Sequence, residues 1–498
     1  MGVIEMKFKE YNQEQPWLIP PDIEVDIPSH DLCRVVNDIV DAIDIRSKEM
    51  KYKEEGNTAY HPRMMLKSLY YSYSQRIFSS RKIAKEHERN IFYWYLSGKQ
   101  RPDFRTISLF RSKHAFELKQ IFIQVTKLCV ELGMVDFTTV AIDGTKVHAN
   151  ASRDKFRDDA WIEHELSTMS NGIDDAFEEA DRIDRQEDEL FGKEKRGDEI
   201  PKDLADEKTR RRKIKELQKE LKDKKLKRIN ETDFDAKIMK SQGAYLPAYN
   251  CQALVDDKNQ IILSAEVTDS PNDWYQIKPR VEEIKREFSR KPEILLADTG
   301  YCDGPSLEYL HDEDIDGYIP DKMSKKIKAE IENKLPEEQK YKKDQFTYDE
   351  GKDVYVCPEG TELARTSRIM TKAARINNDN SKFHTYRCFN KTCPKSTQCH
   401  NAKAGRRIYR FDDQGLRDAM AEKIRSDYGW RRYKNRMKIV EPVFANIKYN
   451  LGLSRFSLRG ISKVNGEFFI VACIHNIKKI GKHLQKNNIV NLKTVLQN

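Results

Sequence analysis

Apolar residues recur at three- and four-residue intervals through residues 29–135, which is the period of an amphipathic helix. The stretches DLCRVVNDIVDAI and MMLKSLYYSY both follow this pattern. Two shorter stretches rich in bases begin at residues that cap helices, Ser79 or Ser80 in one and Asp103 in the other. We therefore expect an all-helical domain over residues 1–135. Its small basic helices either dock on DNA or carry bases that only face solvent.

After Phe137 the pattern changes to short apolar runs bounded by turn residues, which is typical of strands. Strands are predicted at 138–143, 250–255, 261–267 and 293–298, with a short fifth at 317–320, and helices at 273–288 and 303–312. The turn DDKN at 256–259 joins two of the strands as a hairpin. An antiparallel hairpin among buried strands, followed by helices, predicts a mixed α+β or α/β fold with a mixed sheet.

Residues 154–240 interrupt that sheet with a segment of polarised charge. Asp154–Glu189 holds fourteen acids and four bases, whereas Lys208–Arg228 holds twelve bases and three acids. The basic part has one apolar stripe, formed by Ile214, Leu217 and Leu221. We predict an insertion of two helices folded as a hairpin, acidic against basic. The alternative is that the basic half contacts DNA.

The composition changes this picture little. A chain of 498 residues has room for roughly two to four domains, and its net charge is only +9. The N-terminus has no apolar signal segment, and no run approaches the ~18 apolar residues of a membrane span. We expect a soluble intracellular protein without a membrane partner. Nine cysteines make an odd number for a disulfide framework.

The stretch IVEPVFANIK (439–448) lies in a tract where bases dominate. Gly429–Lys479 contains eleven Lys or Arg and two acids, Glu441 and Glu467. A surface that faces phosphates excludes acids unless one is needed to hold a metal ion. Glu441 is therefore a candidate metal ligand.

Two aspartates share a position with respect to the predicted strands. Asp143 ends TVAID and Asp298 ends ILLAD, and small residues follow each of them. Ligands bind beside strand ends in open α/β sheets, although a single strand-end aspartate is often a turn or cap residue. Three carboxylates, Asp143, Asp298 and Glu441, can hold two Mg²⁺ or Mn²⁺ ions about 3.5–4 Å apart. This combination indicates metal-dependent cleavage and transfer of DNA strands.

At these residues the chain resembles the DDE transposases of bacterial insertion sequences, in the group with a Y-R-E-K signature. AIDGTKVHANAS, LLADTGY and RYKNRMKIVEPVFANIK are similar to the three catalytic blocks, and HPRMMLK, FSSRKI and QRPDFRTIS to the N-terminal domain. The resemblance implies a ribonuclease H-like catalytic domain with Asp143, Asp298 and Glu441 as its metal-binding triad. It also implies DNA contacts near the cleaved end by Tyr433, Arg436 and Lys448, to which we add the neighbouring bases Lys438, Arg455 and Arg459.

One departure from the signature concerns Arg436, which precedes Glu441 by five residues instead of four. Five residues turn an α-helix by about 140°, away from the metal face. A π-bulge or kink between Arg436 and Pro442 would restore a shared face. Lys448, two turns after Glu441, needs no correction. The opposite, core-facing stripe consists of Tyr433, Met437, Val440, Phe444 and Ile447, which favours packing for Tyr433.

Four cysteines gather within residues 331–410, at Cys357, Cys388, Cys393 and Cys399. Four thiolates fill a tetrahedral structural Zn²⁺ site, and His384 or His400 can replace one of them. Similar transposases carry a cysteine-rich insertion here, so we expect a small zinc-ribbon-like insertion. Free buried thiols are the alternative.

The predicted organisation divides the catalytic domain by its insertions. Its first part covers residues 136–330, its C-terminal helices with Glu441 cover 411–480, and residues 481–498 form a tail. We expect a bacterial, cytoplasmic, nucleoid-associated enzyme that binds double-stranded DNA at the terminal repeats of its element and at the target. Bringing two ends together requires a homodimer or larger assembly. The alternatives are a catalytically silent or domesticated DNA-binding protein and a ribonuclease H-fold nuclease.

Overall fold

The computed structural model describes most of the chain in two compact units. The described residues are 22–45, 59–169, 202–241, 243–322, 324, 341, 343–366, 383–400 and 405–489. The first unit comprises residues 1–110 and 477–498, and the second comprises residues 111–476. Most of the acidic half of the predicted helical hairpin and the end of the predicted tail lie outside the described residues. No helix in the described ranges is long and apolar enough to cross a membrane.

The first unit is helical, as the periodicity predicts. It contains α1 (Ile23–Asp26), α2 (Leu32–Ala42), α3 (Pro62–Ser74), α4 (Ser80–Arg89), α5 (Ile91–Ser97) and the start of α6 (Phe104–Lys113). Asp103 caps α6 as predicted, since its Oδ1 accepts hydrogen bonds from the backbone N–H groups of Arg105 (2.6 Å) and Thr106 (2.9 Å). Tyr70, Tyr73 and Tyr93 are fully buried in the core of this unit.

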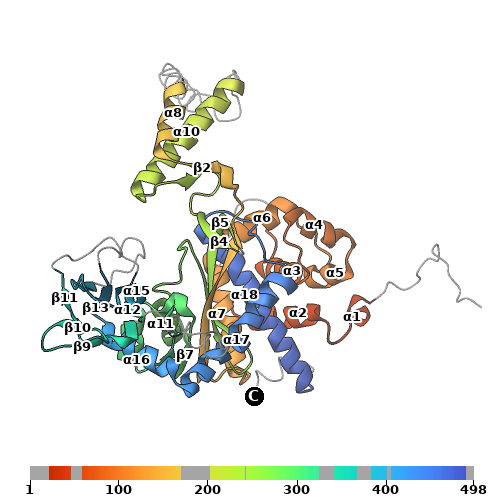
Figure 1. The fold of residues 1–498 in the computed structure, drawn as a ribbon. Helices are drawn as coiled ribbons and strands as arrows, with labels where there is room; N and C mark the ends of the chain where they lie inside the picture. The colour runs from red at the N-terminus through yellow and green to blue at the C-terminus, as the bar shows by residue number, and fades with distance from the viewer. Residues whose placement is uncertain are drawn as a thin grey trace, which may run out of the picture. The chain divides into compact units, whose positions relative to one another are not determined.

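The second unit is built on a mixed six-stranded sheet, which confirms the predicted mixed α/β fold (Figure 1). Its strands are β1 (Thr139–His148), β4 (Lys237–Ser241), β5 (Ala244–Asp256), β6 (Ile262–Thr268), β7 (Ile294–Leu296) and β8 (Asp316–Tyr318). The order is β4-β5-β1-β7-β8, and β6 also pairs with β5. β1, β7 and β8 are parallel, whereas β5 is antiparallel to each of its neighbours. The predicted strands are all present, and β4, with its polar sequence KIMKS, is an addition to them.

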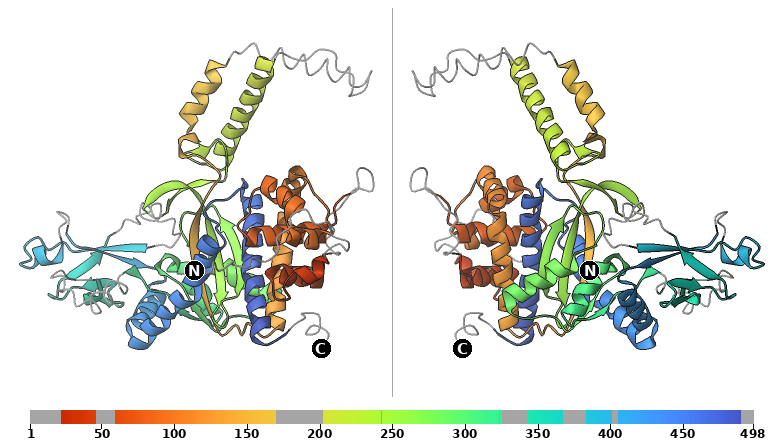
Figure 2. Two further views of the ribbon diagram at one scale, coloured as in Figure 1. Left: turned by 90° about the vertical axis from the view of Figure 1, so that its right-hand side faces the viewer. Right: turned by 90° about the vertical axis from the view of Figure 1, so that its left-hand side faces the viewer.

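Helices of the second unit pack on this sheet. They are α7 (Ala115–Glu131), α11 (Ile277–Phe288), α12 (Gly304–Asp312), α16 (Gln414–Arg425), α17 (Asp427–Ala445) and α18 (Ile461–Lys486), which continues into the first unit. α17 contacts β1, β5 and β7, while α7 and α11 contact β6. α17 thereby places the basic tract of the sequence against the centre of the sheet (Figures 1 and 2).

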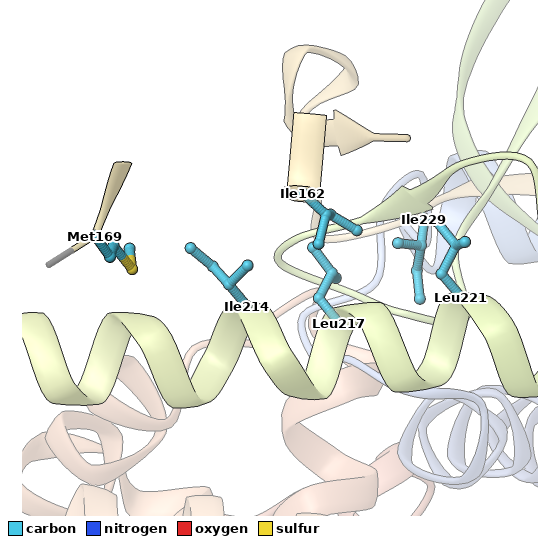
Figure 3. Packing of buried hydrophobic residues seen from close by; sticks show 6 residues of the cluster. All are labelled: Ile162, Met169, Ile214, Leu217, Leu221 and Ile229. Atoms are coloured by element: carbon cyan, nitrogen blue, oxygen red, sulfur yellow. The ribbon is translucent and has the colours of Figure 1, made fainter. Parts of the chain in front are cut away.

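The charged insertion forms a helical arm with a core of its own. α8 (Asp159–Thr168) and α10 (Lys202–Asp223) lie side by side above a two-stranded ladder of β2 (Phe156–Arg157) and β3 (Ile229–Asn230). Figure 3 shows the predicted stripe on α10 pointing toward Ile162 and Ile229; the cluster comprises Ile162, Met169, Ile214, Leu217, Leu221 and Ile229. An ion pair between Arg210 and Glu165 joins the basic helix to the acidic one, as predicted.

The cysteine-rich insertion is a five-stranded antiparallel sheet in the order β13-β12-β11-β10-β9. These strands are β9 (Thr347–Asp349), β10 (Val354–Val356), β11 (Glu362–Arg365), β12 (Phe383–Arg387) and β13 (Arg407–Phe411). Its core is largely aromatic and consists of Phe346, Tyr355, Leu363, Tyr386 and Ile408. Three cysteines, Cys357, Cys388 and Cys399, pack against this core.

Candidate functional site

Asp143 lies on β1, and Asp298 lies two residues beyond the end of the neighbouring parallel strand β7, which ends at Leu296 and not at Asp298 as predicted. The register places Ala141 of β1 opposite Leu296 of β7. Asp143 follows Ala141 by two residues and Asp298 follows Leu296 by two residues, so the two aspartates are neighbours. β1 does not end at Asp143, as the sequence predicted, but continues to His148 because its other edge remains paired with β5.

The Asp143 carboxylate is largely buried and bound by two donors. Its Oδ1 accepts the N–H of Gly144 at 2.8 Å, and its Oδ2 accepts Nη1 of Arg436 at 2.8 Å. Burial raises the pKa of Asp143 to about 6; Arg436 lowers it, and Asp298 raises it further. Two neighbouring carboxylates need a cation, and the Arg436 guanidinium supplies one here.

Asp298 caps the short turn η2 (Thr299–Tyr301), with Oδ1 accepting the N–H of Gly300 at 2.8 Å. This is the ordinary role of an acid at a strand end. In the described part of the chain no donor binds Oδ2 of Asp298. The cap therefore fixes the side chain while leaving one oxygen for a ligand.

Glu441 reaches the same cation from α17. Its side chain is 52% exposed, and its Oε1 lies 3.9 Å from Nη2 of Arg436. Burial alone would lower the pKa of Arg436, but Asp143, with a smaller contribution from Asp298, raises it. The guanidinium of Arg436 thus lies between Asp143 and Glu441, within electrostatic reach of Asp298.

The predicted π-bulge before Pro442 is wrong, because α17 is a continuous α-helix from Asp427 to Ala445. Pro442 has no N–H for the carbonyl of Lys438, and that carbonyl accepts Nε2 of Gln260 at 2.8 Å instead. The proline is therefore tolerated without a bulge. Arg436 faces the sheet and Glu441 faces the solvent, as a rotation of about 140° between them requires. The arginine side chain is nevertheless long enough to bring its guanidinium to 3.9 Å from the Glu441 carboxylate.

A π-helical segment does occur, but it follows Glu441, at Asn446–Asn450. It contains Lys448, which is half-buried and lies within electrostatic reach of Asp143. Burial lowers the pKa of Lys448, and Asp143 opposes this effect. Lys448 is thus near the site, as the heptad spacing predicted.

The other candidate DNA contacts differ in exposure. Tyr433 is buried and packs on Trp430 with ring centroids 5.2 Å apart, as its place on the core-facing stripe indicated. Met437, predicted for the same stripe, is instead 50% exposed. Lys438, Arg455 and Arg459 are exposed. Arg459 donates Nε to the carbonyl of Asn150 at 3.0 Å, and Arg455 forms a β-bridge with His148.

Glu467, the second acid of the basic tract, has a structural role. It is fully buried and accepts the N–H groups of Ser457 (2.9 Å) and Leu458 (3.1 Å) and the Ser457 hydroxyl (2.6 Å). These bonds fix the loop that carries Arg455 and Arg459.

We expect Glu467→Gln to lower the free energy of unfolding by about 1–3 kcal/mol, because the amide turns donors toward buried N–H groups. Urea denaturation would measure this loss. The exposed acid Glu308 provides the control, since Glu308→Gln is expected to change stability by less than about 0.5 kcal/mol. Equal effects of the two substitutions would contradict a structural role for Glu467.

Sequence reasoning missed a polar network beside the aspartates. Asp273 accepts Lys146, Asn250 and Gln252, and the Tyr301 hydroxyl donates to Gln252. Burial raises the pKa of Tyr301, and the charges of Asp273, Asp143 and Asp298 raise it further. A signal was present: Asn250 and Gln252 are two polar residues on one face of a buried strand.

The four predicted zinc ligands lie in one insertion. Burial raises the pKa of Cys399, Arg406 lowers it, and smaller effects of Cys388, Cys357 and Cys393 raise it, so these three cysteines lie within electrostatic reach of Cys399. Within the described ranges, however, no group of three or more His, Cys, Asp or Glu side chains has the arrangement of a metal site. This holds for the cysteines and for the carboxylates around Arg436. A zinc site is therefore not shown.

Two family models match the chain. The family described as "Transposase DDE domain" matches residues 356–481, which include Glu441. The family described as "Transposase domain (DUF772)" matches residues 21–113. Asp143 and Asp298 lie outside both matched segments. No curated protein matches the chain.

Proposed function

We propose, because these two matches indicate a DDE-type transposase family, that this chain cuts the ends of a DNA element and joins them to target DNA. Asp143, Asp298 and Glu441 are the proposed catalytic triad. The observation that carries the proposal is the shared cation: the Arg436 guanidinium binds Asp143, lies 3.9 Å from Glu441 and interacts with Asp298. Three carboxylates from separate elements of the chain thus surround one positive charge.

The donor set fits divalent cations of the Mg²⁺ type, which prefer carboxylate oxygens. The pKa of Asp143 is raised by burial and further by Asp298, and a divalent cation between the two carboxylates would oppose both effects. Asp143, Asp298 and Glu441 would hold the ions, which activate an attacking oxygen and stabilise a leaving oxygen. The fit requires Arg436 to move from its place between the carboxylates.

The protein's own residues then have distinct tasks. Arg436, displaced from Asp143, and Lys448 would bind phosphate oxygens beside the cleaved bond. Lys438, Arg455 and Arg459 contact the DNA backbone farther away, where exposed bases supply affinity without sequence preference. Tyr433 supports α17 by packing. The basic helices α4 and α6 of the first unit are the proposed readers of the terminal repeats.

We propose Zn²⁺ binding by Cys357, Cys388, Cys393 and Cys399 as a structural feature of the insertion. The other three cysteines lie within electrostatic reach of Cys399, and Cys357, Cys388 and Cys399 pack against a small sheet with few core residues. A domain of that size gains stability from a structural metal. Two element ends must be joined in one reaction, so the proposed active form is a dimer or larger assembly on DNA.

A cleavage assay on labelled DNA that carries the terminal repeats of the element tests this function. With Mg²⁺ or Mn²⁺ we expect cuts at the repeats, 3′-OH ends and their transfer to a plasmid, and with EDTA none of these products. Binding to the repeats without cleavage in either metal would favour a silent DNA-binding protein. Equal cleavage of DNA without repeats would favour a nuclease.

A further inference from the structure

Asp273 lies in the turn between β6 and α11 and makes contacts that its position in the sequence does not explain. Its Oδ1 accepts three donors: Nδ2 of Asn250 (2.7 Å), Nε2 of Gln252 (2.7 Å) and Nζ of Lys146 (3.3 Å). Asn250 and Gln252 are fully buried on β5, and Lys146 lies on β1. Three converging donors hold this carboxylate in one orientation.

The same carboxylate packs against the backbone that follows each proposed catalytic aspartate. A Cβ added to Gly144 would lie 2.4 Å from Oδ1 of Asp273, and one added to Gly300 would lie 3.2 Å from its Oδ2. No side chain fits at Gly144 while the network is intact, and Gly300 leaves little room. Gly144 thus makes room for Asp273 and for Nε2 of Gln252, which an added Cβ would also meet at 2.4 Å, and Gly300 makes room for Asp273 and for Oδ1 of Asp298, at 2.9 Å.

The network also ties the two aspartate-bearing elements together. Lys146 lies three residues beyond Asp143 on the same strand. Gln252, bound to Asp273, accepts the hydroxyl of Tyr301, which ends the turn capped by Asp298. One carboxylate therefore connects β1, β5 and η2 at the level of the site.

We propose that Asp273 is a positioning residue for metal binding. It fixes the backbone after Asp143 and after Asp298, so that two mutually repelling carboxylates keep the separation that a divalent cation needs. An uncharged amide can keep its oxygen toward the three donors, but it loses the negative charge that pairs with Lys146 and strengthens the other two hydrogen bonds. This inference rests on the proposed function, because it assigns the metal to Asp143, Asp298 and Glu441.

Binding of Mn²⁺ to the full chain without DNA tests the proposal, with the free ion followed by electron paramagnetic resonance. We expect Asp273→Asn to weaken Mn²⁺ binding about tenfold or more, the usual effect of removing a group that orients metal ligands, with an unchanged number of bound ions. The matched control is Asp256→Asn, since Asp256 is a fully buried aspartate at the far end of β5 that binds backbone N–H groups. It is expected to lower stability but leave Mn²⁺ affinity unchanged.

Lys146→Met, which removes one donor and keeps the apolar stem, provides a second variant if Asp273→Asn does not fold. It should weaken Mn²⁺ binding in the same direction by a smaller factor. The proposal would be overturned if Asp273→Asn bound Mn²⁺ with the affinity of the wild type, or if Lys146→Met did so when only that variant folds. It would also be overturned if Asp273→Asn bound one ion fewer, because Asp273 would then be a direct ligand. Failure of the proposed function would give a different result. In that case Asp298→Asn would bind as much Mn²⁺ as the wild type, or neither protein would bind any.

Discussion

Glu441→Gln is expected to reduce DNA cleavage about a thousandfold or more while binding to terminal-repeat DNA stays within about twofold of the wild type. A metal ligand supplies several kcal/mol of charge stabilisation in the transition state, and about 4 kcal/mol corresponds to a thousandfold in rate. The fold should tolerate the change because the Glu441 side chain is 52% exposed and its one described ion-pair partner, Arg436, also binds Asp143.

Glu422 on the neighbouring helix α16 supplies the control. It is exposed, and Glu422→Gln should alter neither cleavage nor binding. Single-turnover cleavage with Mn²⁺ and a gel-shift titration would measure the two quantities separately. A parallel loss of cleavage and binding in Glu441→Gln would show that the residue supports the structure instead of the reaction.

Stability is expected to depend on pH through Asp143. The pKa of Asp143 is raised to about 6 by burial and Asp298, so the folded protein keeps a proton that the unfolded chain has lost. This stabilisation is fully present below the ordinary aspartate pKa and is lost as the pH rises through about 6. Without metal, the wild type should lose about 2 kcal/mol of unfolding free energy between pH 4 and pH 7 from this group.

Asp143→Asn should remove that dependence. The difference in unfolding free energy between variant and wild type should therefore grow by about 2 kcal/mol from pH 4 to pH 7 in EDTA. Urea denaturation at several pH values would measure it. Asp312→Asn, at an exposed position of α12, should give the same difference at every pH. A pH-independent difference for Asp143→Asn would contradict the raised pKa.

The sequence predicted the elements that bring the aspartates together because their signals are local. Buried strands are read from short apolar runs, and Asp143 and Asp298 each follow such a run. Parallel pairing of β1 with β7 then suffices to make them neighbours. The continuation of β1 to His148 was missed because GTKVH is weakly apolar, and its strand conformation depends on pairing with β5.

Other features depend on tertiary contacts that no periodicity encodes. The position of Arg436 was predicted from helix rotation alone, but the length of its side chain decides whether its guanidinium reaches Asp143. Pro442 is accommodated by Gln260, which is far away in the sequence. Asp273 was the first residue of the predicted helix 273–288, which begins instead at Ile277, and only folding brings Asp273 to Gly144 and Gly300.

The separate core of the α8–α10 arm has a consequence for how such chains can diverge in length. The cluster around Leu217 contains no residue of the six-stranded sheet, so the arm can lengthen, shorten or change its surface without repacking the site. Closing a longer loop costs little extra free energy, about 0.6 kcal/mol for each doubling of its length. The arm, which lies between Asp143 and Asp298 in the sequence, is thus free to vary, while the strands on either side of it keep the two aspartates close in space.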